Sequence, residues 1–268
     1  MSKNLKIIAL ISCIGWLAFI FAAFRGYHFW YEGFVILFWF FLGILNYDQH
    51  TSLWLFKNKP RRFFTLYSFL FIFFFFIDFV VAQKLANLWY YPYHNSLARL
   101  IEIYLLYPFS GLPVLELVYF ISSIFNEKLN FIKEPFRGWH KLIDYIEIAS
   151  FPLVVLLPLV LSILRLNHIA DALVWGFIFW LVIATIKFKY HIKHWFHFVA
   201  IFIVAAIISI FLNEIPNVGT YEWIYNDIPI SALNRHILGV PLWIQLGWYV
   251  FVLLMLKFWM HFVLKERS

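Results

Sequence analysis

The sequence has little charge and almost no cysteine. Only 13% of its 268 residues are charged, and Cys13 is its one cysteine. A single cysteine excludes an intramolecular disulfide framework and a metal site built from cysteines. The low charge, together with 64% hydrophobic residues and a mean hydropathy of +0.81, excludes an ordinary soluble domain. The chain is therefore predicted to be an integral membrane protein.

Several function classes lack their sequence signature. There is no Gly-rich phosphate loop, no Ser/His/Asp set with recognisable spacing, and no Lys in the middle of an apolar segment for a retinal Schiff base. The net charge of +7 is explained by a basic face beside anionic lipid, without nucleic acid. His191, His194 and His197 lie among lysines, which favours an interfacial basic helix over a metal site. We expect no metal, no cofactor and no nucleic-acid partner.

Long apolar segments are what the sequence has in abundance. A helix crosses the bilayer core with roughly 20 apolar residues. Eight such segments are predicted: Ile7–Phe24, Phe29–Leu45, Phe63–Ala82, Leu100–Phe125, Tyr145–Leu164, Ile169–Phe188, Phe196–Asn213 and Ile237–Met260. The fourth contains Pro108, Gly111 and Pro113 and is expected to be kinked. The predicted fold class is an all-α polytopic membrane protein.

The distribution of basic residues predicts the orientation. With the N-terminus in the cytoplasm, 16 of the 21 Lys and Arg residues lie in cytoplasmic segments. The five on the other face are Arg25, Lys84, Arg99, Arg165 and Arg235. This positive-inside bias favours an even number of spans, with both termini cytoplasmic, in a plasma or inner membrane.

One pattern of residues occurs twice, as an acid, then Trp-x-Tyr, then Gly-x-Pro. Its members are Asp78, Trp89–Tyr91 and Gly111–Pro113, and then Glu214, Trp223–Tyr225 and Gly239–Pro241. The two Trp-x-Tyr sequences are 134 positions apart, half of 268, and the two Gly-x-Pro sequences are 128 apart. The pattern predicts an internal duplication into four-helix repeats, 1–136 and 137–268, with one site between them.

The acids differ in their expected depth. Glu116 lies 14 residues beyond Glu102 in the fourth segment, about 21 Å along a straight helix. A carboxyl at that depth is costly and is a candidate proton donor. The alternative is that Glu116 bonds to a neighbouring helix and holds the bundle together. Asp78 and Glu214 are expected near the membrane interface, as candidate partner groups, and Glu222 and Asp227 as solvated residues.

At these positions the chain resembles the membrane enzymes of carotenoid biosynthesis. The first half is similar to the lycopene cyclase domain, which has an Asp at a helix end, a Trp-x-Tyr-like stretch and a Gly-x-Pro-x-Glu-Glu helix followed by aromatic residues. The matching residues are Asp78, Trp89, Gly111, Pro113, Glu116, Tyr119 and Phe120. The second half is similar to the related carotenoid hydratases, through Glu214, Gly219, Tyr221, Trp223, Val240, Pro241, Leu242 and Trp248. Leu115 stands where the cyclase family has the first Glu of its pair.

The resemblance implies an enzyme that protonates a terminal C=C bond of a long polyene or other isoprenoid, giving a ring or an alcohol without net redox change. It implies Glu116 as proton donor, with Asp78 and Glu214 as partner acid or base. The implied substrate-binding residues are Trp89, Tyr91, Pro113, Tyr221, Trp223, Tyr225, Pro241 and Trp248. Aromatic faces stabilise a carbocation, although Trp and Tyr are also common interface anchors. Since some family members are heterodimers, the resemblance allows a homo- or heterodimer.

Two other function classes remain open. A transporter or carrier would also combine a duplicated bundle with a site between its halves. A non-catalytic scaffold would show the aromatic residues without needing Glu116. An enzyme predicts that Glu116, Asp78 and Glu214 converge on one apolar cavity open to lipid. A transporter predicts a polar path to both faces, and a scaffold predicts no cavity.

Overall fold

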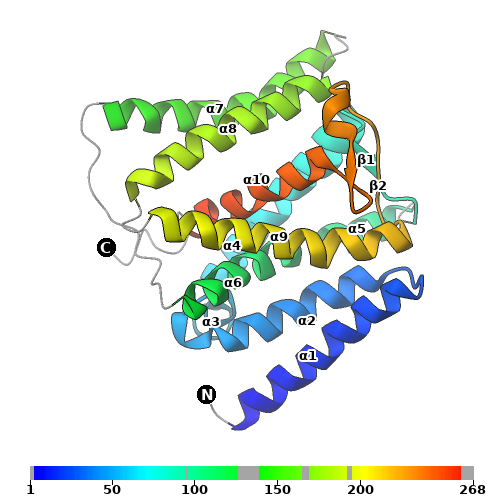
Figure 1. Cartoon of the computed structure of the whole chain (residues 1–268), viewed down its shortest axis with the longest axis vertical. Coiled ribbons are helices and arrows are strands. Elements are labelled where there is room, and N and C mark those ends of the chain that lie inside the picture. Colours follow the sequence, from blue (N-terminus) through cyan, green and yellow to red (C-terminus); the bar gives the residue numbers. More distant parts are fainter. Residues whose placement is uncertain (1–2, 94–95, 126–138, 165–168, 192–194, 261–268) are drawn as a thin grey trace.

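The computed structural model describes residues 3–93, 96–125, 139–164, 169–191 and 195–260. It is an all-α polytopic membrane fold whose helices run roughly side by side (Figure 1). The hairpin of α1 (Lys3–Phe24) and α2 (Trp30–Leu45) lies at the bottom of that view. The hairpin of α7 (Trp139–Ile163) and α8 (Ile169–His191) lies at the top, with the remaining long helices between the two.

Seven helical segments of the described residues are long and apolar enough to cross a membrane. They are Lys3–Phe24, Pro60–Leu85, Ile103–Ile124, Tyr145–Ile163, Ile169–Ile186, Trp195–Thr220 and Leu242–Trp259. The eighth predicted segment, Phe29–Leu45, is the shorter apolar helix α2, which a 3-10 turn (η1, Tyr47–Gln49) and the short helix α3 (Ser52–Asn58) follow. The predicted boundary between repeats, at 136 and 137, lies outside the described residues.

The third span changes its helix type along its length. It begins as the α-helix α4 (Pro60–Phe74), with Pro60 at its first turn, and continues as the π-helix η2 (Phe75–Leu85). Wide π turns are rare and occur most often at functional sites. Asp78 lies inside η2 and is 3% exposed, so it is buried within the span. The sequence had placed it near the membrane interface, at the end of the span.

The fourth span is broken where the prolines predict. Helix α5 (Leu97–Leu106) ends before Tyr107, and α6 (Pro108–Ile124) begins directly after it. Proline lacks the N–H that would continue the backbone ladder, but it is well suited to a first helical turn. The helix is therefore interrupted at Tyr107, directly before Pro108, and the kink itself stays a prediction.

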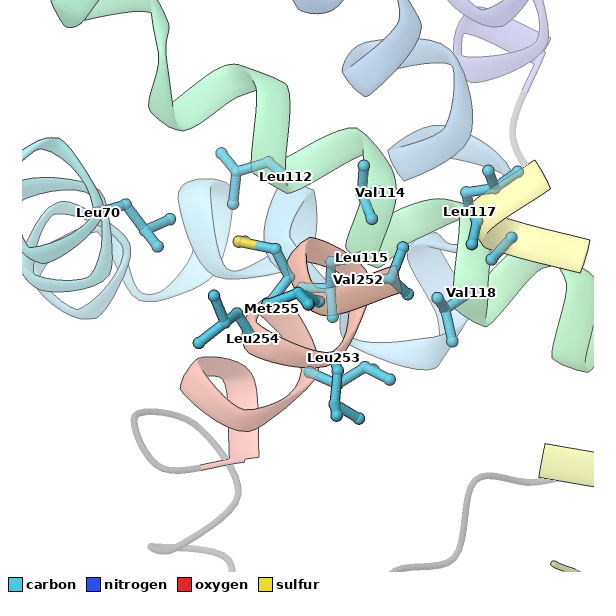
Figure 2. Close-up of a cluster of buried hydrophobic side chains, with 14 of the residues drawn as sticks. Leu70, Leu112, Val114, Leu115, Leu117, Val118, Val252, Leu253, Leu254 and Met255 are labelled. Carbon is cyan, nitrogen blue, oxygen red and sulfur yellow. The ribbon is translucent and has the colours of Figure 1, made fainter. Parts of the chain in front are cut away.

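The core lies where α6 crosses α10 (Leu242–Trp259). Leu112, Leu115 and Val118 of α6 are fully buried and share one helix face. They meet Val252 and Met255 of α10 (Figure 2). A Cβ at Gly111 would lie 2.6 Å from the Met255 sulfur, so a larger residue there would require the Met255 side chain to move.

The two hairpins make matching contacts with the central helices. The α1–α2 hairpin packs on α6 through α2 and on α9 (Trp195–Thr220) through α1. The α7–α8 hairpin packs on α10 through α8 and on η2 through α7. Each hairpin therefore contacts one central element of its own half and one of the other half. Exchange of this kind is what an approximate two-fold axis would produce, and the duplication itself stays a prediction.

The connections after the long helices are short strands. Strand β1 (Trp89–Tyr90) pairs antiparallel with β2 (Ile224–Tyr225), with Trp89 opposite Tyr225. After the 3-10 turn η3 (Ser231–Asn234), strands β3 (His236–Ile237) and β4 (Val240–Pro241) form a hairpin that leads into α10. Its two-residue turn is Leu238–Gly239, with φ values of 56° and 81°, the positive pair typical of a type I′ turn.

Candidate functional site

A cavity of about 360 Å³ lies between the central helices and α8. This volume is at the small end of the range for small-molecule sites, whose walls are mostly apolar with a few polar groups. Its apolar wall comes from α4, η2, α8 and α10, and includes Phe74, Phe177 and Phe251. Two acids, Asp78 and Glu214, line the same cavity. The arrangement is that of a small-molecule site with two carboxyl groups.

Asp78 is held by side-chain donors from three parts of the fold. In the described residues its Oδ1 accepts from two groups and its Oδ2 from three. The donors are Trp89 Nε1 at 2.9 Å and Tyr107 OH at 3.0 Å on Oδ1, then Tyr104 OH at 2.6 Å, Gln83 Nε2 at 2.9 Å and Tyr91 OH at 3.4 Å on Oδ2. Neutral donors can stabilise a carboxylate without an Arg or Lys partner.

Glu214 lies within α9 and is held in a similar way. Trp248 Nε1 donates to its Oε1 at 2.7 Å, and Trp223 Nε1 donates to its Oε2 at 3.2 Å. The Tyr225 hydroxyl lies 2.9 and 2.8 Å from the two carboxyl oxygens. Glu214 is 3% exposed, because α9 extends to Thr220, seven residues beyond the predicted end of this span.

A turn of the same kind precedes each Trp that binds an acid. Asn87 and Tyr221 both have a positive φ, of 50° and 56°, and each lies two residues before the Trp. This left-handed conformation is uncommon outside glycine, and it reverses the chain after the long helix. The Asn217 side chain then bonds both backbone groups of Trp223, at 2.9 and 3.1 Å. Trp223 is thereby fixed above Glu214.

The β1–β2 ribbon joins the two acid clusters. Its register pairs Trp89 with Tyr225 and Tyr90 with Ile224. The first residue of one Trp-x-Tyr sequence therefore faces the last residue of the other. Asn226 strengthens the join, since its backbone N–H donates to the Leu88 carbonyl at 2.8 Å. Pairing in this register places both aromatic sequences at the same end of the cavity.

Aromatic rings form the wall between the acids. The Trp89 and Trp243 rings stack, with centroids 6.0 Å apart and an interplanar angle of 22°. Tyr225 meets Trp243 edge-on at 5.6 Å, and Tyr31 of α2 meets Trp223 edge-on at 4.9 Å. Ring faces of this kind attract a positive charge in a desolvated site.

The tyrosines of the connecting strands stay in their neutral form far into the alkaline range. Burial and the neighbouring Glu214 carboxylate raise the pKa of the Tyr225 phenol well above its usual range. Burial, followed by the charge of Asp78, does the same to the pKa of Tyr91. Both groups therefore act as hydrogen-bond donors to the acids at neutral pH.

Glu116 lies apart from this cavity. Glu116 is not among the described residues that line the cavity. The expected convergence of the three acids is therefore wrong for Glu116. Its carboxyl accepts from the backbone N–H groups of Ser52 at 2.9 Å and Leu53 at 3.4 Å, and from Asn46 Nδ2 at 2.9 Å. The Ser52 hydroxyl also donates to it. Glu116, fully buried, thus anchors the start of α3 against α6.

Of the eight predicted substrate-binding residues, the structure places five at the cavity. These are Trp89, Tyr91, Trp223, Tyr225 and Trp248. The other three are not among the described lining residues: Pro113, Tyr221 and Pro241. Pro113 is buried inside α6, and Pro241 ends a strand before α10, so the two Gly-x-Pro sequences adopt different local structures. Tyr221 is 56% exposed because it makes the turn after α9.

Several residues of the site were not expected from the sequence. Tyr104, Tyr107 and Gln83 donate to Asp78, and Tyr31 and Trp243 line the cavity. Gln83 follows Asp78 by five residues, the spacing of one π turn, so its proximity depends on a helix type that the sequence did not signal. The position of Tyr107 directly before Pro108 signalled the interruption of the helix but not the direction of the side chain.

Two further acids, Glu222 and Glu147, are buried, although Glu222 was expected to be solvated. Glu222 is 2% exposed, accepts from the Phe29 backbone N–H, and lies 3.8 Å from His28 Nδ1. Glu147 of α7 forms an ion pair with Lys257 of α10. Asp227 is exposed, as expected. Within the described residues, no group of three or more His, Cys, Asp and Glu residues is arranged to hold a metal ion.

Comparison of the chain with protein-family models, with curated proteins and with solved structures finds no match.

Proposed function

We propose that this chain is a membrane enzyme of isoprenoid or carotenoid metabolism that protonates a terminal C=C bond of a long polyene. The observation that carries the proposal is the pair Asp78 and Glu214 on one apolar cavity, each held by Trp and Tyr donors. Acid catalysis on an alkene needs a carboxyl donor, a base, an apolar slot and a wall that tolerates positive charge. The cavity supplies all four kinds of group.

The reaction begins with transfer of a carboxyl proton to the terminal alkene, which leaves a tertiary carbocation. Attack by an internal alkene closes a ring, and loss of a proton to the second carboxylate completes an isomerisation. Alternatively, water adds to the carbocation and releases its proton to the same base. In both routes one carboxyl loses a proton and the other gains one, so no redox cofactor is required.

The two acids differ in the number of their donors, which suggests their roles. Within the described residues, Asp78 accepts from five side chains and Glu214 from three. Hydrogen bonds from neutral donors favour the charged form of a carboxyl group. We therefore assign Asp78 as the base and Glu214 as the proton donor. Glu116 has no role in the chemistry under this proposal, because it holds α3.

A non-catalytic carrier of an isoprenoid is the second candidate. The observation that favours it is the satisfaction of both acids by protein donors, which a binding site also achieves. A carrier would retain its ligand unchanged, whereas the enzyme would release a product.

The proposed setting, for the enzyme and for the carrier, is the lipid bilayer of a plasma or inner membrane.

The test is expression of the full chain in cells that accumulate lycopene, with pigments separated by chromatography and identified by mass. A product of unchanged mass and new retention time indicates cyclisation, and a gain of about 18 mass units indicates hydration. The product is expected to disappear in Asp78→Asn and Glu214→Gln. Absence of any new pigment from well-expressed protein would refute the reaction on this substrate.

A further inference from the structure

Gly247 of α10 is a distinctive residue of the cavity wall. Of the described residues that line the cavity, Gly247 alone is exposed. A Cβ placed on it would meet no heavy atom within 4 Å. Gly247 follows Trp243 by one turn of α10, and its neighbour Trp248 donates to Glu214. Gly247 therefore lies at the level of the acids and not at the far end of the cavity.

The cavity extends along two membrane-spanning helices. On α10 its lining runs from Trp243 to Leu254, about 16 Å at 1.5 Å per residue. On α8 it runs from Leu173 to Leu181, about 12 Å. The cavity-lining residues of α8, and those of α10 that follow Trp248, are apolar. This shape suits a chain of linked isoprene units and would be poorly matched to a polar ligand.

The outward face of α8, away from the cavity, is apolar. Trp175, Phe179 and Val182 of α8 are exposed, at 57%, 51% and 51%. Both α8 and α10 belong to segments long and apolar enough to span a membrane. In a bilayer such side chains contact acyl chains, so an opening in the wall that α8 and α10 form would face lipid rather than water.

We infer that the cavity opens sideways into the bilayer at Gly247 and that a long isoprenoid chain passes through this gap, with one end reaching Asp78 and Glu214. The ligand class rests on the proposed function, whereas the lipid-facing opening does not. The missing side chain of Gly247 makes the gap, and the volume of about 360 Å³ limits the enclosed part to one end of a long polyene.

The opening is tested with nitroxide spin labels on the full chain in lipid nanodiscs. Labels are attached in a Cys13→Ser background to Gly247→Cys, to Val182→Cys as a lipid-facing control, and to Asp227→Cys as an exposed loop control. The label at 247 is expected to collide with oxygen far more than with a water-soluble nickel complex, as at 182 and opposite to 227. Preference for nickel, or protection from both reagents, would overturn the inference.

Passage of the chain is tested with Gly247→Leu, whose Cβ would meet no heavy atom within 4 Å. Lycopene retained per purified protein is expected to fall at least tenfold relative to wild type, and to stay unchanged in Val182→Leu. Equal retention by Gly247→Leu, or no retention by wild type, would overturn this role of the gap. Retained lycopene without any product would instead refute the proposed reaction and leave the opening intact.

Discussion

Glu116 and Glu214 are both buried glutamates in apolar helices, yet their surroundings differ in kind. Glu116 accepts from backbone N–H groups at the start of α3 and from Asn46, a residue at the end of α2. Glu214 accepts from the side chains of Trp223, Tyr225 and Trp248, on the wall of a cavity. The Glu116 carboxyl accepts hydrogen bonds from N–H groups at the start of α3 that have no partner within the helix. The Glu214 carboxyl faces a cavity that a ligand can fill.

The comparison shows that burial alone does not identify a reactive acid. An intramembrane carboxyl is costly in either place, and both are stabilised by hydrogen bonds. The type of donor distinguishes them. Backbone N–H groups at the start of a helix have no partner within the helix, so an acid that accepts from them has a structural role. Side-chain donors beside a cavity position the acid while leaving one side of it accessible to substrate. Asp78 belongs with Glu214 by this criterion.

The largest effect is expected from the cavity acids. Asp78→Asn and Glu214→Gln should each lower turnover by about 10²- to 10⁴-fold, the usual contribution of a general acid or base. Product formed per folded protein in lycopene-containing membranes measures the loss. Glu116→Gln serves as the matched control and should retain turnover in proportion to the protein that folds. Full activity in either cavity variant would remove the distinction between the two kinds of acid.

The next effect concerns stability and should fall on Glu116. Glu116→Ala leaves the Ser52 and Leu53 N–H groups without their acceptor, while Asn46 Nδ2 keeps its bond to the backbone carbonyl of residue 116. The loss should lower the free energy of unfolding by about 3 kcal/mol or more. Thermal melting in detergent measures this change. The exposed acid Asp227 gives the control, since Asp227→Asn should change stability by no more than about 0.5 kcal/mol. An unchanged melting temperature in Glu116→Ala would contradict the anchoring role.

A smaller effect should separate the two cavity acids from each other. Trp248→Phe removes one of three donor side chains from Glu214, whereas Trp89→Phe removes one of five from Asp78. Glu214 becomes charged when it gives up its proton, and a lost hydrogen bond to a charged group costs about 1.5–3 kcal/mol. Trp248→Phe is therefore expected to lower kcat/KM by about tenfold or more, and Trp89→Phe by less. The reverse order, measured in the same membranes, would show that donor number does not set their roles.

The smallest effect is a pH dependence of stability from Tyr225. Its pKa is raised in the folded protein by burial and by Glu214, so the unfolded chain loses its phenol proton first as the pH rises. The stabilisation is complete below about pH 10 and declines above it. Melting temperatures between pH 8 and 11.5 should fall less steeply in Tyr225→Phe than in wild type. Identical slopes would indicate that Tyr225 ionises normally.

Much of the fold follows from composition and spacing. Segments of about 20 apolar residues must form helices in lipid, because their backbone groups have no other partners there. The break before Pro108 was predicted from covalent chemistry, since proline has no N–H to donate. The repeated pattern also predicted one shared site, and Asp78, Glu214 and the Trp and Tyr residues of both Trp-x-Tyr sequences line one cavity.

The errors share a physical cause. The position of a residue along a span predicts its depth in the membrane, but it does not predict which neighbouring helix its side chain faces. Glu116 was expected to meet the other acids because it is deep, yet its helix face turns toward α2 and α3. Glu222 was expected in solvent because it follows a span, yet the turn at Tyr221 directs it toward Phe29. Pro113 and Pro241 share a motif, but one lies inside a helix and the other before one.

By itself, the sequence determined that this chain resides in a membrane as a helical bundle and that an acid and a Trp-x-Tyr sequence occur once in each half. Those properties depend on local composition and on the cost of exposing polar backbone to lipid. Only the tertiary structure decided which acids share a cavity, because that depends on helix rotation, on the π turns of η2 and on the register of β1 with β2. The gap at Gly247 likewise has no signature in sequence, since an absent side chain acquires meaning only from what surrounds it.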